Sequence, residues 1–78
     1  MANRMCERIA EIACDLVAKG ITWSFDELAF ELGQNPRLMG RRVGSAYKAM
    51  MDEGREEEAA AIANAFVDKF GNYCYDRD

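Results

Sequence analysis

The chain has 78 residues, of which half are apolar and 31% are charged, so it can form one domain with a modest core and is too hydrophobic to remain disordered. It contains no run of roughly 18 apolar residues, and Glu7 stands where a signal peptide would have its apolar segment, so we expect a cytoplasmic protein without a membrane span. The formal net charge of -4 argues against a protein that binds nucleic acid over its whole surface.

The first predicted helix covers about residues 3–19. Its apolar residues recur at spacings of three and four, which is the period of a helix that buries one face. They are Met5, Ile9, Ile12, Ala13, Leu16 and Val17. Gly20 follows and suits the left-handed conformation that ends a helix. The β-prone segment Ile21-Thr22-Trp23 is then expected to be a short connector whose apolar side chains pack against the core.

The second predicted helix covers about residues 24–32 and begins at a capping box. In this motif the Ser24 hydroxyl accepts a hydrogen bond from the N–H of Glu27, and the Glu27 carboxylate accepts one from the N–H of Ser24. Trp23 and Leu28, on either side of the cap, can form a hydrophobic staple. Gly33 is expected to end this helix.

The third predicted helix covers about residues 36–51. Asn35 is a good N-cap, and Pro36 suits the first helical position because it has no N–H to leave unpaired. On a helical wheel one face collects the apolar residues Met39, Val43, Ala46 and Met50. The nearly opposite face collects Arg37, Arg41 and Lys48.

The fourth predicted helix covers about residues 55–70, after a break at Asp52-Glu53-Gly54. Its predicted buried face comprises Ala59, Ile62, Ala63, Phe66, Val67 and Phe70. Gly71 and Asn72 are expected to end it, and the tail of about residues 73–78 should be partly frayed, with part of it docked back. The sequence therefore predicts a single all-α domain over residues 1–78, with four helices around one core.

Few residues in the sequence suit catalysis or metal binding. The cysteines Cys6, Cys14 and Cys74 are irregularly spaced and histidine is absent, which excludes zinc-finger spacing, catalytic triads and Cys-His pairs. The run Glu56-Glu57-Glu58 allows a metal-site interpretation, but adjacent carboxylates point to different sides of a helix, which favours a solvated surface. We therefore expect a non-enzymatic protein without metal or cofactor, whose cysteines serve as small apolar residues.

Positive charge is concentrated in the third predicted helix. From residue 32 to residue 51 no acidic residue occurs, whereas acidic residues precede and follow this stretch. Two helices joined by a Gly-containing turn, the second with a basic face, match the helix-turn-helix arrangement that places its second helix in the DNA major groove. The candidate nucleic-acid or partner contacts are Arg37, Arg41, Arg42 and Lys48, with Ser45 and Gln34 as polar contacts.

One stretch of the chain has a pattern known from a protein family. The pattern consists of the segment Thr22–Ala29, then Leu32-Gly33 and Pro36, then Arg41-Arg42-Val43-Gly44-Ser45-Ala46. Residues 22–46 thereby resemble the helix-turn-helix of alkylguanine-DNA alkyltransferases and alkyltransferase-like proteins. The resemblance implies that Arg41 matches the arginine that enters the base stack from the minor groove, and Phe25 the tyrosine that helps rotate the nucleotide. The family's Pro-Cys-His-Arg acceptor motif is absent, so alkyl transfer is not implied.

Three functional classes follow from these patterns. The first is a small DNA-binding or regulatory protein that uses the basic third helix on duplex DNA. The second is a compact adaptor or inhibitor, of the kind found in phages and mobile elements, that docks through the same surface on an acidic protein. The third, an enzyme, is disfavoured by the missing catalytic residues. With about four basic residues a monomer should bind DNA weakly, which favours a homodimer or a second protein.

Overall fold

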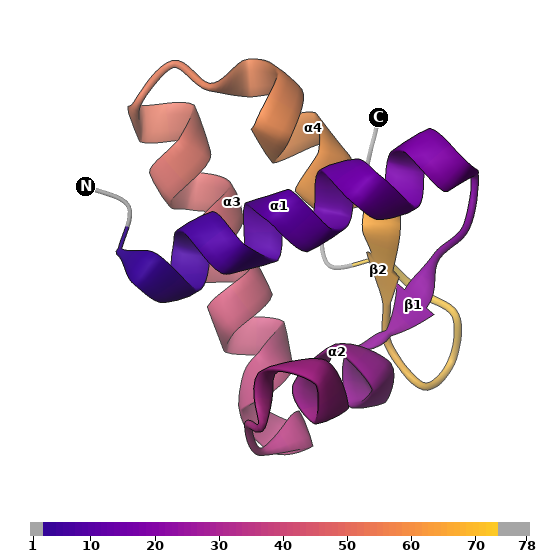
Figure 1. Cartoon of the computed structure of the whole chain (residues 1–78). Helices are drawn as coiled ribbons and strands as arrows, with labels where there is room; N and C mark the ends of the chain where they lie inside the picture. The colour runs from indigo at the N-terminus through magenta and orange to yellow at the C-terminus, as the bar shows by residue number, and fades with distance from the viewer. Residues whose placement is uncertain (1–2, 74–78) are drawn as a thin grey trace.

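The computed structural model describes residues 3–73, which form four α-helices and a short two-stranded sheet (Figure 1). In chain order the elements are α1 (Arg4–Lys19), β1 (Trp23–Ser24), α2 (Phe25–Leu32), the 3-10 helix η1 (Pro36–Leu38), α3 (Met39–Asp52), α4 (Glu56–Ala65) and β2 (Phe66–Val67). The predicted all-α class with four helices is confirmed. Apart from Tyr73, the tail predicted to fray lies outside the described residues. Within residues 3–73, no helix has the length and apolar character that crossing a membrane requires.

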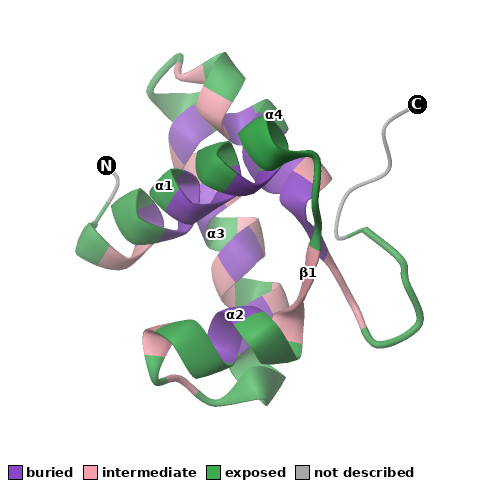
Figure 2. Cartoon of the chain, turned by 45° about the vertical axis from the view of Figure 1, so that its right-hand side comes forward, coloured by how far each residue is buried: buried purple, intermediate pink, exposed green. Residues whose placement is uncertain are grey.

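Helices α1, α3 and α4 pack against one another, and the shorter α2 packs against α3. Figure 2 shows the buried residues of the helices turned toward the space between them and the exposed residues turned outward. The largest fully buried side chains are Phe66, Ile9, Leu16, Leu28, Met39, Met50, Ile62 and Val43. Because burial of each such side chain is worth about 1.5–3 kcal/mol before chain entropy is counted, these residues supply the main stabilising contribution.

The ends of the first two helices follow the signals in the sequence. The Asn3 side chain accepts a hydrogen bond from the Cys6 N–H at 2.9 Å and caps α1, and Gly20 ends α1 with φ 71°. At α2 the predicted capping box is confirmed: the Glu27 N–H donates to Ser24 Oγ at 3.2 Å, and the Ser24 N–H donates to Glu27 Oε1 at 3.5 Å.

The third helix begins differently from its prediction. Asn35 is the N-cap and Pro36 is the first helical residue, as expected, but residues 36–38 form a 3-10 turn and the α-helix starts at Met39. The Leu38 N–H donates to the Asn35 carbonyl at 3.0 Å, and the Met39 N–H donates to the Pro36 carbonyl, so these bonds span three residues instead of four. The tighter turn changes the direction in which this segment presents Arg37.

The predicted fourth helix is too long at its C-terminal end. Helix α4 ends at Ala65, and Phe66 has the extended conformation φ -125°, ψ 140°. Strand β2 pairs with β1 in parallel, with Trp23 opposite Phe66 and Ser24 opposite Val67. The helix ends because this long-range pairing and the burial of Phe66 stabilise an extended backbone there.

The predicted inward position of Phe70 is also wrong, because Phe70 lies in a loop after β2 and is 76% exposed. The Asp68 carboxylate accepts hydrogen bonds from the N–H groups of Phe70 and Asn72 at 2.8 and 2.9 Å, and Val67 forms an antiparallel bridge with Tyr73. A side chain that bonds to backbone groups two and four residues later stabilises a turn in place of a continued helix.

Two further apolar residues are more exposed than predicted. Val17, which was predicted to face the core, is 45% exposed. In the connector after α1, Trp23 packs against the core as expected, whereas Ile21 is 48% exposed. Burial of the connector therefore depends on Trp23, which is also the residue that pairs with β2.

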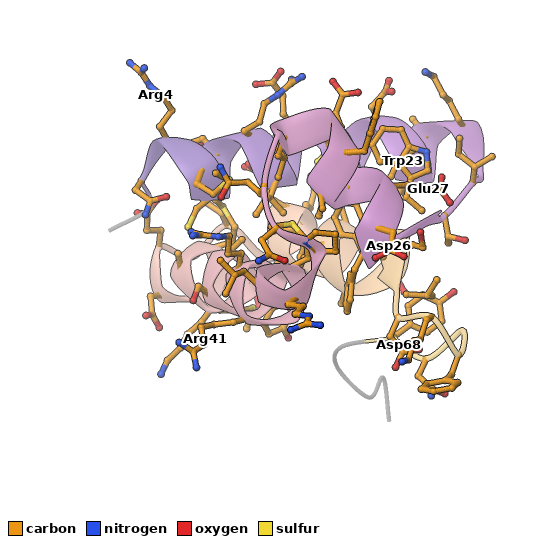
Figure 3. All side chains as sticks on the ribbon, turned by 90° about the horizontal axis from the view of Figure 1, so that it is seen from below. Arg4, Trp23, Asp26, Glu27, Arg41 and Asp68 are labelled. Carbon is orange, nitrogen blue, oxygen red and sulfur yellow. The ribbon has the colours of Figure 1, made fainter. Side chains whose placement is uncertain are left out.

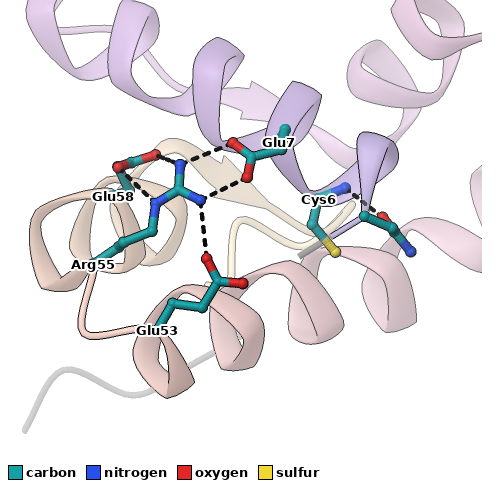
Figure 4. Close-up of polar contacts among 6 residues, drawn as sticks. Cys6, Glu7, Glu53, Arg55 and Glu58 are labelled. Atoms are coloured by element: carbon teal, nitrogen blue, oxygen red, sulfur yellow. Dashed lines mark hydrogen bonds and ion pairs between the residues drawn. The ribbon is translucent and has the colours of Figure 1, made fainter. Parts of the chain in front are cut away.

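Arg55, at the start of α4, joins three parts of the chain through its guanidinium group (Figure 4). Nη1 and Nη2 donate to the two carboxylate oxygens of Glu7 at 2.6 and 2.8 Å, and Nε donates to Glu58 at 3.0 Å. Glu53, the C-cap of α3, accepts a further bond from Nη1 at 3.2 Å. The hydrogen bonds from Arg55 lower the pKa of Glu7, and the bonds to Glu7 and Glu58 raise the pKa of Arg55. This cluster holds the turn between α3 and α4 against the first turns of α1.

Replacement of Ser24 by alanine should lower the free energy of unfolding by about 1 kcal/mol, because the N–H of Glu27 loses its acceptor. Urea denaturation measures this change. The matched control is Ser45→Ala in the exposed face of α3, which removes the same hydroxyl without removing a cap and should leave stability within about 0.5 kcal/mol of wild type. Equal effects of the two substitutions would contradict the assignment of Ser24 as a stabilising cap.

Replacement of Glu7 by glutamine should lower the melting temperature at neutral pH and have a diminishing effect as the pH falls. The pKa of Glu7 in the folded protein lies below its ordinary value of 4.5, so its ionised form adds stability above that pH, and this stability is lost on acidification through the folded pKa. Thermal unfolding of both proteins at neutral pH and at about pH 3 measures the difference in melting temperature. The control Asp52→Asn removes a carboxylate that has no ion pair among residues 3–73 and should show no such convergence with wild type.

Candidate nucleic-acid interface

The surface that matches the prediction best is the basic face, which we define as Arg37, Arg41, Ser45 and Lys48. All four residues are exposed, and they come from η1 and α3. Opposite them, Met39, Val43, Ala46 and Met50 are completely buried. In Figure 3 the Arg41 side chain extends away from the body of the molecule. The predicted phase of this helix, with a core face and an opposite basic face, is therefore what the structure shows.

The turn before η1 fixes where the basic face begins. Gly33 has φ 65°, a left-handed conformation that glycine adopts without strain, and its N–H donates to Phe30. The Gln34 N–H donates to the Ala29 carbonyl at 2.9 Å, which ties the turn to the end of α2. Gln34 is half-buried in this turn, so it lies at the margin of the basic face and is less accessible than the arginines.

Most basic residues on α1 and at the start of α4 are ion-paired with neighbouring carboxylates, whereas Arg4 and Lys69 have no ion pair within residues 3–73. Arg8 lies 3.2 Å from Glu11, Lys19 lies 2.9 Å from Asp15, and Arg55 has three carboxylate partners. In contrast, within residues 3–73 no ion pair involves the cations of the basic face or the neighbouring Arg42. The positive charge of η1 and α3 is therefore free to interact with an external anion.

Arg42 differs from the other predicted contact residues because it is half-buried. Its Nε atom is buried and has no hydrogen-bond partner. Arg42 lies on the flank of α3 that faces the start of α1, where it lines a pocket of about 220 Å³ with Asn3, Cys6, Arg41 and Ser45. The structure therefore sets Arg42 apart from the exposed residues Arg37, Arg41 and Lys48, with which it was predicted to share a role in binding.

A second groove, of about 340 Å³, lies between the start of α2, η1 and the loop after β2. Phe25, Pro36 and Phe70 give it apolar walls. Its charged residues are balanced, with Arg37 and Lys69 positive and Asp26 and Asp68 negative. The Lys69 ammonium lies 5.1 Å from the centre of the Phe70 ring. Sequence reasoning missed this groove because it placed residues 66–70 in a helix, although Asp68 and Gly71 are residues that favour turns.

The thiols and carboxylates of the described chain form no recognisable reactive centre. Within residues 3–73 no three Cys, Asp or Glu side chains are grouped closely enough to hold a metal ion. Cys6 is buried, and burial together with the negative charges of Glu58 and Glu57 raises the pKa of the exposed Cys14 thiol. Cys14 is therefore less ionised at neutral pH than an ordinary thiol, and Cys74 lies outside the described residues.

Comparison with known proteins adds no further constraint, since no protein-family model, curated protein or solved structure matches this chain. Two features of the structure therefore bear on function. The cations of the basic face have no ion pair within residues 3–73, and Arg42 lines a pocket beside them.

The two faces of α3 should respond differently to truncation. Met39→Ala should lower the free energy of unfolding by about 2–5 kcal/mol, because Met39 is completely buried and its removal leaves a cavity. Arg41→Ala should change it by no more than about 0.5 kcal/mol, since Arg41 is exposed and has no ion pair within residues 3–73. Urea denaturation of both variants measures the contrast, and comparable losses would show that the phase of α3 is wrong.

Proposed function

We propose that the protein binds duplex DNA through its basic face and acts as a small DNA-binding or regulatory protein. The observation that carries this proposal is that these cations have no carboxylate partner within residues 3–73, whereas the other basic side chains on α1 and at the start of α4 are largely ion-paired. DNA phosphates supply the missing negative charge, and release of the counterions around them drives this kind of binding.

The shape of the segment suits the major groove. Helix α3 has 14 residues, which is a length of roughly 21 Å, and its outward face is free of acidic side chains until Asp52 at its C-terminal end. A helix fits the major groove, which is roughly 12 Å wide, and in helix-turn-helix proteins the N-terminal residues of the second helix contact base edges. Arg41 and Ser45 occupy such positions here, with Gln34 and Arg37 placed for contacts at the margin.

The resemblance of residues 22–46 to the helix-turn-helix of alkylguanine-DNA alkyltransferases and alkyltransferase-like proteins supports the same proposal. The segment that carries the resemblance coincides with β1, α2, the turn and the first half of α3. Phe25 is half-buried and packs against the core, so it is held in place beside the groove that Arg37 and Phe70 line.

Acidic residues limit how much of the molecule can approach DNA. Asp26 and Glu27 occupy the first turn of α2, and Glu56, Glu57 and Glu58 occupy the first turn of α4. Phosphates are repelled at both places, so contact is confined to η1, α3 and their immediate margins. A monomer with so few phosphate contacts binds weakly, and two associated copies on adjacent half-sites would combine their binding free energies.

An acidic protein surface is the alternative partner. The observation in its favour is that Leu38 and Met51, at the two ends of α3, are 39% and 43% exposed. Apolar residues at the ends of a charged face are more typical of a protein interface than of a DNA phosphate contact. In this case the basic face would pair with carboxylates and the two apolar residues would be covered by the partner.

The DNA proposal predicts that Lys48→Gln and Arg41→Gln each weaken binding to duplex DNA and reduce the slope of log affinity against log salt concentration by about one. Fluorescence anisotropy with a labelled duplex over a range of salt concentrations measures both quantities. The matched control is Lys19→Gln, which removes the same charge from an ion-paired position at the end of α1 and should leave the slope unchanged.

Absence of duplex binding at low salt in the wild-type protein would reject the DNA proposal. If Lys19→Gln lowered the slope as much as Lys48→Gln, the net charge of the protein rather than the basic face would be responsible. A stoichiometric complex with an acidic protein that is lost on Arg41→Gln, in a protein that does not bind DNA, would favour the alternative.

A further inference from the structure

The pocket beside Arg42 has a composition that distinguishes it from the rest of the surface. Its walls are the start of α1 with Asn3, Met5 and Cys6, and the flank of η1 and α3 with Leu38, Arg41, Arg42 and Ser45. None of the residues that line it is acidic. Two arginines contribute to its walls, so in a chain with a net charge of -4 it is a site of relatively positive potential.

Arg42 lacks the partners that a partly buried arginine normally has. Its Nε–H is shielded from water, has no acceptor among residues 3–73, and belongs to a side chain without an ion pair in that range. A buried donor without an acceptor is costly, and such groups in folded proteins usually have a partner that is a side chain, a water or a bound ligand. Arg55 provides the contrast, because its guanidinium donates hydrogen bonds to three carboxylates and stabilises the fold.

An oxyanion is a chemically suitable partner for such an arginine. An arginine donates two parallel hydrogen bonds to a phosphate or carboxylate through one edge of its guanidinium group, and a serine hydroxyl and the first N–H groups of a helix can complete the set of donors. The pocket volume of about 220 Å³ is several times the roughly 30 Å³ occupied by one water, so a tetrahedral anion has room in it.

We infer that this pocket is a phosphate-binding site, in which Arg42 is the principal ligand, Arg41 and Ser45 close the outer side, and the first turn of α1 forms the opposite wall. The inference rests on the proposed function for the source of the phosphate. Because Arg41 and Ser45 also belong to the basic face, we expect the phosphate to come from a DNA backbone at the edge of α3. Free phosphate and phosphate monoesters have the same recognisable chemistry and are the other source.

In the proposed complex the Nε edge of the Arg42 guanidinium donates hydrogen bonds to two phosphate oxygens. Lysine at this position keeps the charge but has no planar edge with two parallel donors, so Arg42→Lys should bind phosphate more weakly than wild type. Glutamine lacks the charge as well, and Arg42→Gln should weaken phosphate binding by about tenfold or more, the usual worth of a hydrogen bond to a charged group.

The test is a titration of the full chain with inorganic phosphate, followed by NMR through the backbone amides and the Nε–Hε resonance of Arg42. Sodium chloride at matched ionic strength is the reference. We expect saturable shifts at Cys6, Arg42 and Ser45 with phosphate and not with chloride. Lys48→Gln, which removes a cation outside the pocket, should leave these shifts unchanged, and unchanged spectra elsewhere show that each variant is folded.

A second arm adds duplex DNA and identifies the source of the phosphate. Movement of the Arg42 Nε–Hε resonance in the same direction as with inorganic phosphate, with competition between the two, would assign the pocket to a DNA backbone phosphate. Saturable phosphate binding without any DNA binding would support the pocket, assign it to a free phosphate or monoester, and reject the proposed function.

Other results would reject the phosphate pocket and leave the DNA proposal standing. DNA binding that depends on Lys48, without a saturable phosphate shift at Arg42, would overturn the pocket and leave the proposed function intact. Equal shifts with phosphate and chloride, or shifts that Arg42→Gln leaves unchanged, would also overturn the pocket. Either result would mean that phosphate acts at the surface as an adventitious ion only.

Discussion

Helix α3 has one face fixed in the core, and this constraint determines what its other faces can do. Met39, Val43, Ala46 and Met50 are completely buried, so the residues on the opposite side of the same helix must face solvent. Basic side chains occupy that side, and the acidic side chains of the chain lie before or beyond it. A separation of charge along the sequence thereby becomes a separation in space, and the cations of η1 and α3 are left without partners within residues 3–73.

The acidic part of the molecule has its own counter-charge in Arg55. By bonding Glu7, Glu53 and Glu58 at once, Arg55 offsets part of the negative charge around the turn after α3 and fixes the start of α1 beside the end of α3. The same placement brings Asn3 and Cys6 next to the flank of α3, where they form one wall of the pocket that contains Arg42. The Arg55 cluster therefore stabilises the fold and also helps to position the walls of the pocket, although Arg55 itself does not line it.

Local signals in the sequence were sufficient for most helix starts and for the orientation of α3. Ser24 with Glu27, and Asn35 with Pro36, mark their helices through bonds that each segment makes within itself. The end of α4 could not be found in this way. Phe66 fits a helical apolar pattern, and its extended conformation depends on pairing with Trp23, which is distant in sequence and becomes a neighbour only after the helices have packed. The error at Phe70 follows from the error at Phe66, because the loop fixed by Asp68 begins where β2 ends.

The candidate site was predictable to the same extent as the helix that carries it. The sequence identified the basic residues of α3 and listed Arg42 with Arg41 as a candidate contact, because a helical wheel gives directions around one helix and not the elements that pack against it. Whether a flank is exposed depends on the element packed beside it, and the start of α1 makes the position of Arg42 half-buried. In the proposed complex this difference gives the two arginines different roles. Exposed Arg41 contributes an attraction that salt screens and that tolerates small displacements of the DNA, whereas Arg42, held in a pocket, accepts a phosphate at one position and so fixes how far α3 lies along the groove.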